Sequence, residues 1–282
     1  MGIDQKILDC LYSELNPQDV EQVLRAAEGA RLRGSKLKSA GLEEYLIAAS
    51  EDDPVLRQQF LDRHNELNPK EAVGEVLYWP FPAGHRSQLM GGTRAMTFAL
   101  MDMMGLGYPV VILFTPRVFS WSYLGFLNTF VHELKHATDF YHGLHIPTSS
   151  GTASRSRGII IDHTNFKRID PRILGHVEEL SAYQASYQYA KASGQPKELV
   201  NLEREHVLHM YTDLATCLRL DSGVRTNIGE LLYLGNGFQR RVIKGALEAA
   251  RDTLGYTNPG QKSLNSCLSE VTVRGGKHER QL

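Results

Sequence analysis

Residues 125–143 read Gly-Phe-Leu-Asn-Thr-Phe-Val-His-Glu-Leu-Lys-His-Ala-Thr-Asp-Phe-Tyr-His-Gly. Apolar side chains recur in this stretch every three or four residues, which predicts a largely buried helix that begins near Gly125 and ends at Gly143. The apolar positions are Phe126, Leu127, Phe130, Val131, Leu134, Ala137, Phe140 and Tyr141. Two histidines, His132 and His136, stand four residues apart in the middle of this stretch, so they share one face of the helix.

The segment His132-Glu133-Leu134-Lys135-His136 is an H-E-x-x-H motif. Its two imidazoles can bind one metal ion, and Glu133 lies beside that ion, where it can take a proton from a metal-bound water. A histidine pair inside a buried helix is costly unless a partner satisfies the ring nitrogens, and a metal ion does so. The motif therefore predicts a Zn²⁺-dependent hydrolase, most often a peptidase. The simpler alternative is a solvated helix with two stacked histidines.

A catalytic zinc site needs a third protein ligand and one open position for water. His142 is one candidate, because it follows His132 by ten residues, as in metzincin-type sites. Those sites have a glycine that breaks the helix at the position where this chain has Asp139. Without that break, His142 stays on the helix and lies well off the face that carries His132 and His136.

Glu179 is the second candidate for the third ligand. Asp170-Pro171 predicts the start of another helix, with the aspartate as N-cap and the proline in the first turn. Apolar residues then recur at helical spacing up to Gly194, which places Glu179 about two turns into this helix. A glutamate from a second helix completes the two-histidine, one-glutamate site of gluzincins. The neighbouring Glu178 is an alternative ligand, and both glutamates could instead be surface residues.

The stretch from His132 to Gly143 resembles the active-site helix of the anthrax lethal factor-type gluzincins. That family carries the pattern H-E-x-x-H-A-x-D-x-Y-x-G, and this chain has the family's residue at every fixed position. The family's third ligand is the glutamate of a downstream E-x-x-A element, and Glu179-Leu-Ser-Ala182 is similar to it. Related H-E-L-x-H-A proteins include phage, bacterial-effector and toxin-like peptidases, so the resemblance does not specify a substrate.

The resemblance implies an α+β fold: a mainly helical, zincin-like metallopeptidase with a small mixed sheet beside the H-E-x-x-H helix. It also implies that His132, His136 and Glu179 bind Zn²⁺, with Glu133 as the general base that hydrolyses a peptide or protein substrate. Two other classes of protein remain open. One is a non-catalytic, metal-stabilised binding protein, and the other is a zinc hydrolase that acts on a non-peptide amide.

Two further side chains are candidates for supporting roles. The lethal factor-type family uses a tyrosine shortly before its glutamate ligand, but this chain has no tyrosine between Gly143 and Glu179. Tyr183, one turn after Glu179, is the predicted donor to the developing oxyanion, with ordinary packing as the alternative. Asp139 lies one turn beyond His136 and could accept the second ring N–H of a ligand histidine, unless it is simply an exposed carboxylate.

Composition limits the classes of protein to which this chain could belong. Charged residues make up 22% of the 282 residues and the formal net charge is −1, so charge gives no indication of nucleic-acid binding. No apolar segment approaches the length of a membrane span, and the N-terminus lacks the apolar core of a signal peptide. The three cysteines are far apart and form no C-x-x-C pair, which predicts free thiols. We therefore expect a protein that is cytoplasmic, or secreted without a cleavable signal peptide; the sequence does not predict its oligomeric state.

The pattern also suggests three successive regions. A helical N-terminal region over 1–70 is expected to act as a cap or partner-binding module, or to pack onto the core; helices should start at Asn16-Pro17 and Asp53-Pro54. A zincin-like catalytic domain follows over 71–260, and a polar tail covers 261–282.

Within the predicted catalytic domain, short β-branched runs alternate with turn residues. We expect strands within 73–80, 109–115 and 158–162, and a helix over 93–104. The serine- and glycine-rich stretch over 148–158 is expected to be a loop that could close over the site. One edge of the sheet is expected to hold the peptide substrate by strand addition.

Overall fold

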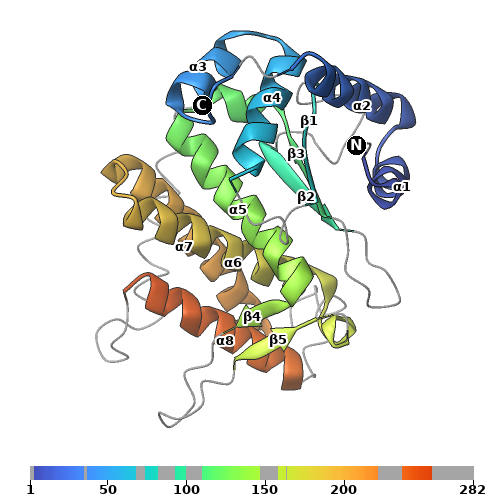
Figure 1. Cartoon of the computed structure of the whole chain (residues 1–282). Helices are drawn as coiled ribbons and strands as arrows, with labels where there is room; N and C mark the ends of the chain where they lie inside the picture. Colours follow the sequence, from blue (N-terminus) through green and yellow to red (C-terminus); the bar gives the residue numbers. More distant parts are fainter. Residues whose placement is uncertain are drawn as a thin grey trace, which may run out of the picture. The chain divides into compact units, whose positions relative to one another are not determined.

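The structure, a computed structural model, describes residues 3–34, 37–67, 74–81, 93–99, 110–146, 158–162, 164–221 and 237–255. The chain divides into two compact units, Met1–His142 and Gly143–Leu282. The described residues are mostly helical, with one three-stranded mixed sheet and one two-stranded sheet (Figure 1). The predicted α+β class, mainly helical with a small mixed sheet, is confirmed at this level.

Four helices precede the sheet in the first unit: α1 (Gln5–Glu14), α2 (Pro17–Leu32), α3 (Leu42–Ser50) and α4 (Pro54–Asn65). Three of them start at a side-chain cap, because a side-chain oxygen of Asp4, Asn16 and Asp53 accepts a hydrogen bond from the backbone N–H two residues later. α2 and α4 also have proline in the first turn. The helix starts predicted at Asn16-Pro17 and Asp53-Pro54 are thus confirmed.

The three-stranded sheet contains β1 (Glu75–Tyr78), β2 (Ala95–Ala99) and β3 (Val110–Phe114) in the order β1-β3-β2. β1 runs parallel to β3, whereas β2 runs antiparallel to β3 and pairs Thr97 with Ile112. All five residues of β3 are buried, as expected for a strand that is covered on both faces. The strands expected within 73–80 and 109–115 are confirmed.

Alternate residues of the sheet enter two separate apolar cores. One face of the sheet packs with α3, α4 and α5 (Tyr123–His142) and contributes Val76, Tyr78, Ala95, Ile112 and Phe114. The other face packs with α1 and α2 and contributes Leu77, Trp79, Val111 and Leu113. Helices therefore cover both faces of the sheet within the first unit, and α5 is fixed against one of these faces.

The prediction of a helix over 93–104 is wrong, because residues 95–99 form strand β2. Alanine and methionine favour helices, so the stretch Ala-Met-Thr-Phe-Ala has little local preference for a strand. Pairing with β3 overrides that preference, and Met96 and Phe98 then pack toward one core while Ala95 packs toward the other. The two-residue period puts Thr97 on the face of Ala95, which is the face covered by α5.

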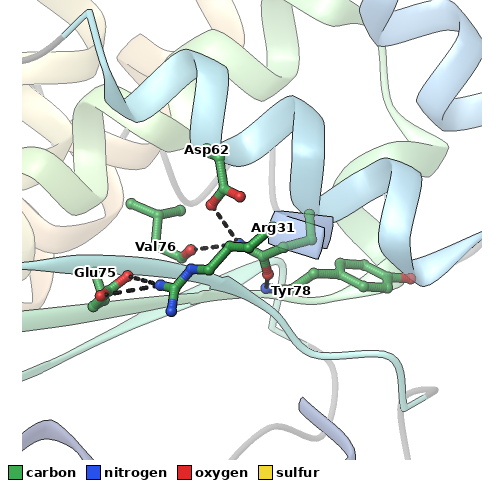
Figure 2. Close-up of polar contacts among 6 residues, drawn as sticks. Arg31, Asp62, Glu75, Val76 and Tyr78 are labelled. Atoms are coloured by element: carbon green, nitrogen blue, oxygen red, sulfur yellow. Dashed lines mark hydrogen bonds and ion pairs between the residues drawn. The ribbon is translucent and has the colours of Figure 1, made fainter. Parts of the chain in front are cut away.

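β1 is an edge strand of the described sheet, and a side chain of α4 bonds to its outer edge (Figure 2). The amide N–H of Gln58 donates to the carbonyl of Val76 at 2.9 Å, and the N–H of Tyr78 donates to the amide oxygen of Gln58 at 2.7 Å. The same amide nitrogen also donates to Asp62 at 2.8 Å. A side-chain amide thus takes the place of a neighbouring strand along this edge.

An ion pair lies at the start of the same strand (Figure 2). Arg31 of α2 approaches Glu75 of β1 at 3.2 Å. Burial raises the pKa of Glu75 and of the neighbouring Asp62, and the positive charge of Arg31 partly opposes both shifts. The pair joins α2 to the sheet at a half-buried position.

The described part of the second unit combines a two-stranded sheet with three helices. β4 (Leu144–Ile146) and β5 (Ile159–Ile161) pair antiparallel, which confirms the strand expected within 158–162. One apolar core is formed by this two-stranded sheet together with α6 (Pro171–Ala192), α7 (Lys197–Asp221) and α8 (Gly237–Thr253). The chain divides after His142, and the boundaries predicted at residues 70 and 260 stay predictions. Most of the predicted loop over 148–158 and all of the tail over 261–282 lie outside the described residues.

Candidate metal centre

Helix α5 carries the H-E-x-x-H motif. It begins at Tyr123, slightly before the predicted start, and ends at His142, followed by Gly143 with φ of +79°. Phe126, Phe130 and Ala137 anchor the helix in the core of the first unit. The motif is thus held on a helix that is well packed along its length.

The two motif histidines lie side by side on α5. Nε2 of His132 is 3.1 Å from Nε2 of His136, and the two half-buried rings cross edge to face with centroids 4.8 Å apart. Two imidazole nitrogens bound to one tetrahedral zinc at the usual bond length would be roughly 3.3 Å apart. The helix therefore presents both nitrogens at a separation that suits a shared zinc ion.

Glu133 is buried beside the histidine pair, with 6% of its surface exposed. The hydroxyl of Thr97, on β2, donates to Oε2 of Glu133 at 2.5 Å and lies 3.3 Å from the backbone oxygen of the same residue. Thr97 is not among the site residues predicted from the sequence, because the predicted helix over 93–104 includes it. The alternation of Met96, Thr97 and Phe98 between apolar and polar was the signal that could have revealed it.

Glu179 comes from α6, which starts as the sequence predicts. The side chain of Asp170 accepts a hydrogen bond from the N–H of Arg172 at 2.9 Å, and Pro171 occupies the first turn. Ile173, Val177 and Leu180 face the core of the second unit, which leaves Glu179 half-buried.

Among the described residues, one group of three or more His, Cys, Asp or Glu side chains could hold a metal ion. It consists of His132, His136 and Glu179, each of which offers one ligand atom, and these atoms lie within 4.8 Å of one another. Glu178 and His142, the alternative third ligands, are not members of this group. His142 is exposed at the end of α5.

Tyr183 and Asp139, the two residues predicted to have supporting roles, each contact a neighbouring side chain. The ring of Tyr183 packs against His206 of α7 with centroids 4.8 Å apart, at the margin of the core of the second unit. Asp139 forms an ion pair with Lys135 one turn earlier, and its side chain is only 9% exposed. Asp139 is therefore not the exposed carboxylate of the simpler alternative. Its contact with a ligand histidine and the oxyanion role of Tyr183 both remain predictions.

No protein-family model, curated protein or solved structure matches the chain. Within the described residues, no helix is both long enough and apolar enough to cross a membrane.

Proposed function

We propose that this protein is a zinc-dependent metallopeptidase of the gluzincin type, with a zincin-like catalytic fold. The observation that carries the proposal is the grouping of His132, His136 and Glu179, with a buried glutamate next to the first histidine. Two neutral imidazoles and one carboxylate form the ligand set of catalytic zinc sites that keep a fourth position open. A purely structural zinc site has no need of a base such as Glu133.

The ligands and the base have separate tasks in this proposal. His132, His136 and Glu179 would hold the ion with a net positive charge. When bound, zinc supplies a Lewis acid that polarises a carbonyl and lowers the pKa of water to about 7. Glu133 accepts the proton of the attacking water and then delivers a proton to the leaving amine. Tyr183 is the proposed donor to the oxyanion.

The sheet of the first unit supports a peptide as the substrate. β2 is an edge strand of the described sheet and runs antiparallel to β3. It is also the strand whose Thr97 contacts Glu133. An extended peptide that pairs with this edge would run past the base, and its backbone would contribute hydrogen bonds whatever its side chains are.

The metal content of purified variants tests the ligand set. Elemental analysis should find about one zinc per chain in the wild type, in Glu178→Ala and in His142→Ala, and a loss of zinc in Glu179→Ala. Glu178→Ala is the matched control, because it removes the neighbouring glutamate from the same turn of α6. Loss of zinc in His142→Ala instead would favour a metzincin-like ligand set. A wild type that stays metal-free after zinc is supplied would refute the proposal.

Hydrolysis tests the chemistry separately from the ligands. Zinc-loaded wild type should cleave an unfolded protein such as fluorescently labelled casein, and Glu133→Gln should retain its zinc but lose cleavage by about 100-fold or more. Equal activity in both proteins would exclude Glu133 as the base. If the zinc-loaded protein cleaves no peptide bond, the result would favour a binding protein or a hydrolase of non-peptide amides.

A further inference from the structure

Thr97 contacts the proposed base from outside the motif. Its hydroxyl donates a 2.5 Å hydrogen bond to Oε2 of Glu133. Because Glu133 is almost fully buried, bulk water competes poorly for this oxygen. A hydrogen bond to a carboxylate in such a place is stronger than one between neutral groups in water, so it governs where the carboxylate points.

We propose that Thr97 is a positioning residue that fixes the carboxylate of Glu133 for hydrolysis. Its hydroxyl occupies Oε2, which leaves Oε1 as the oxygen available to accept a proton. Without this anchor, the carboxylate would rotate and point Oε1 at the water for only part of the time. The inference rests on the proposed function, since it assigns the orientation of the base in that same reaction.

The strand that carries Thr97 is itself anchored to α5. Thr97 pairs with Ile112 in the sheet, so its backbone is held by β3. Near the start of β2, the guanidinium of Arg94 lies 3.6 Å from the centre of the Trp121 ring, and one of its nitrogens is 3.5 Å from the hydroxyl of Thr129. Thr129 stands one turn before Glu133, so neighbouring turns of α5 contact Thr97 of β2 and Arg94, the residue just before β2. The hydroxyl of Thr97 is therefore presented from a supported position.

Three variants isolate the contribution of this hydroxyl. Thr97→Val keeps the shape and the strand preference of threonine but removes the donor, whereas Thr97→Ser keeps the donor. Thr138→Val removes a hydroxyl that bonds to a backbone carbonyl of α5, at Leu134, and serves as the control. On labelled casein, Thr97→Val should lower kcat by about 10- to 100-fold with little change in KM or zinc content, as for residues that orient a reacting group. Thr97→Ser should restore most of the rate, and Thr138→Val should match the wild type.

A second readout needs neither zinc nor activity. In a chelator, the urea midpoint of unfolding is compared for the wild type, Thr97→Val, Glu133→Ala and the double variant. Thr97→Val should lower the midpoint when Glu133 is present, because it leaves a buried carboxylate oxygen without this donor. The same change should lower the midpoint by less than half as much in the Glu133→Ala background.

The two readouts separate the inference from the proposed function. A wild-type kcat in Thr97→Val, or a rate in Thr97→Ser as low as in Thr97→Val, would overturn the positioning role while the peptidase stands. Additive effects on the urea midpoint would overturn the contact itself. A wild type that binds no zinc would refute the proposed function, and with it the role of Thr97 in hydrolysis.

Discussion

At the scale of single residues, His64 is a titratable side chain that the fold holds in an apolar site. Its ring packs against Phe60, Phe126 and Phe130 at centroid distances of 6.0, 5.1 and 4.4 Å, and 9% of its surface is exposed. Burial lowers the pKa of His64 from 6.5 to about 4, because the apolar surroundings disfavour the imidazolium form. Between about pH 4 and pH 6.5, this imidazole is therefore neutral in the folded protein but protonated in the unfolded chain.

This shift predicts a loss of stability in mild acid. Since the folded pKa lies below the unfolded one, the stabilisation is complete above pH 6.5 and is lost as the pH falls toward about 4. Between pH 7 and pH 4.5, the free energy of unfolding should fall by about 2 kcal/mol more in the wild type than in His64→Phe. Urea unfolding at the two pH values measures this difference. The exposed His209→Gln is the control and should lose as much stability in acid as the wild type. An equal loss in His64→Phe would contradict a role for His64 in the acid response.

At the scale of elements, helix starts could be predicted because their signals are local. Asp53-Pro54 and Asp170-Pro171 each combine an N-cap with a first-turn proline, and both start helices. The spacing of His132 and His136 is equally local, so their place on one helix face follows from the sequence alone. Patterns within a few residues were enough for all of these features.

Strand β2 could not be predicted in this way, because its partner β3 and not its composition makes it a strand. The short apolar–polar alternation of residues 96–98 hints at a strand, but no local pattern indicates that Thr97 contacts Glu133. Glu179 could be predicted from the sequence only in part. Its place in a capped helix is a local property, whereas its approach to the two histidines depends on how distant parts of the chain fold.

The covered edge of β1 gives a prediction at the same scale. Gln58 is 1% exposed and bonds to both the carbonyl of Val76 and the N–H of Tyr78. Gln58→Met keeps the size of the side chain but leaves these two backbone groups without that partner, which should lower the free energy of unfolding by about 2 kcal/mol. Urea unfolding measures the change. Gln18→Met, at an exposed position of α2, is the control and should change stability by no more than about 0.5 kcal/mol. An equally small effect of Gln58→Met would show that the edge of β1 does not need the amide of Gln58.

At the scale of the whole molecule, the proposed ligand set joins residues that are far apart in the sequence, His132 and His136 on α5 and Glu179 on α6. A metal ion held by all three would bind the folded chain and not the unfolded one, so its binding free energy would add to the stability of the whole chain.

This arrangement predicts how zinc changes thermal stability. At a free zinc concentration of about 100 times Kd, the wild type should gain about 2.7 kcal/mol over the protein in a chelator, seen as a higher Tm in differential scanning calorimetry. Glu179→Ala should lose most of this gain, because only the two histidines of α5 remain as ligands. Glu178→Ala should keep the gain, since it leaves the ligand set intact. An equal rise in Tm for wild type and Glu179→Ala would mean that Glu179 is not a ligand, and that another residue or water occupies the third position.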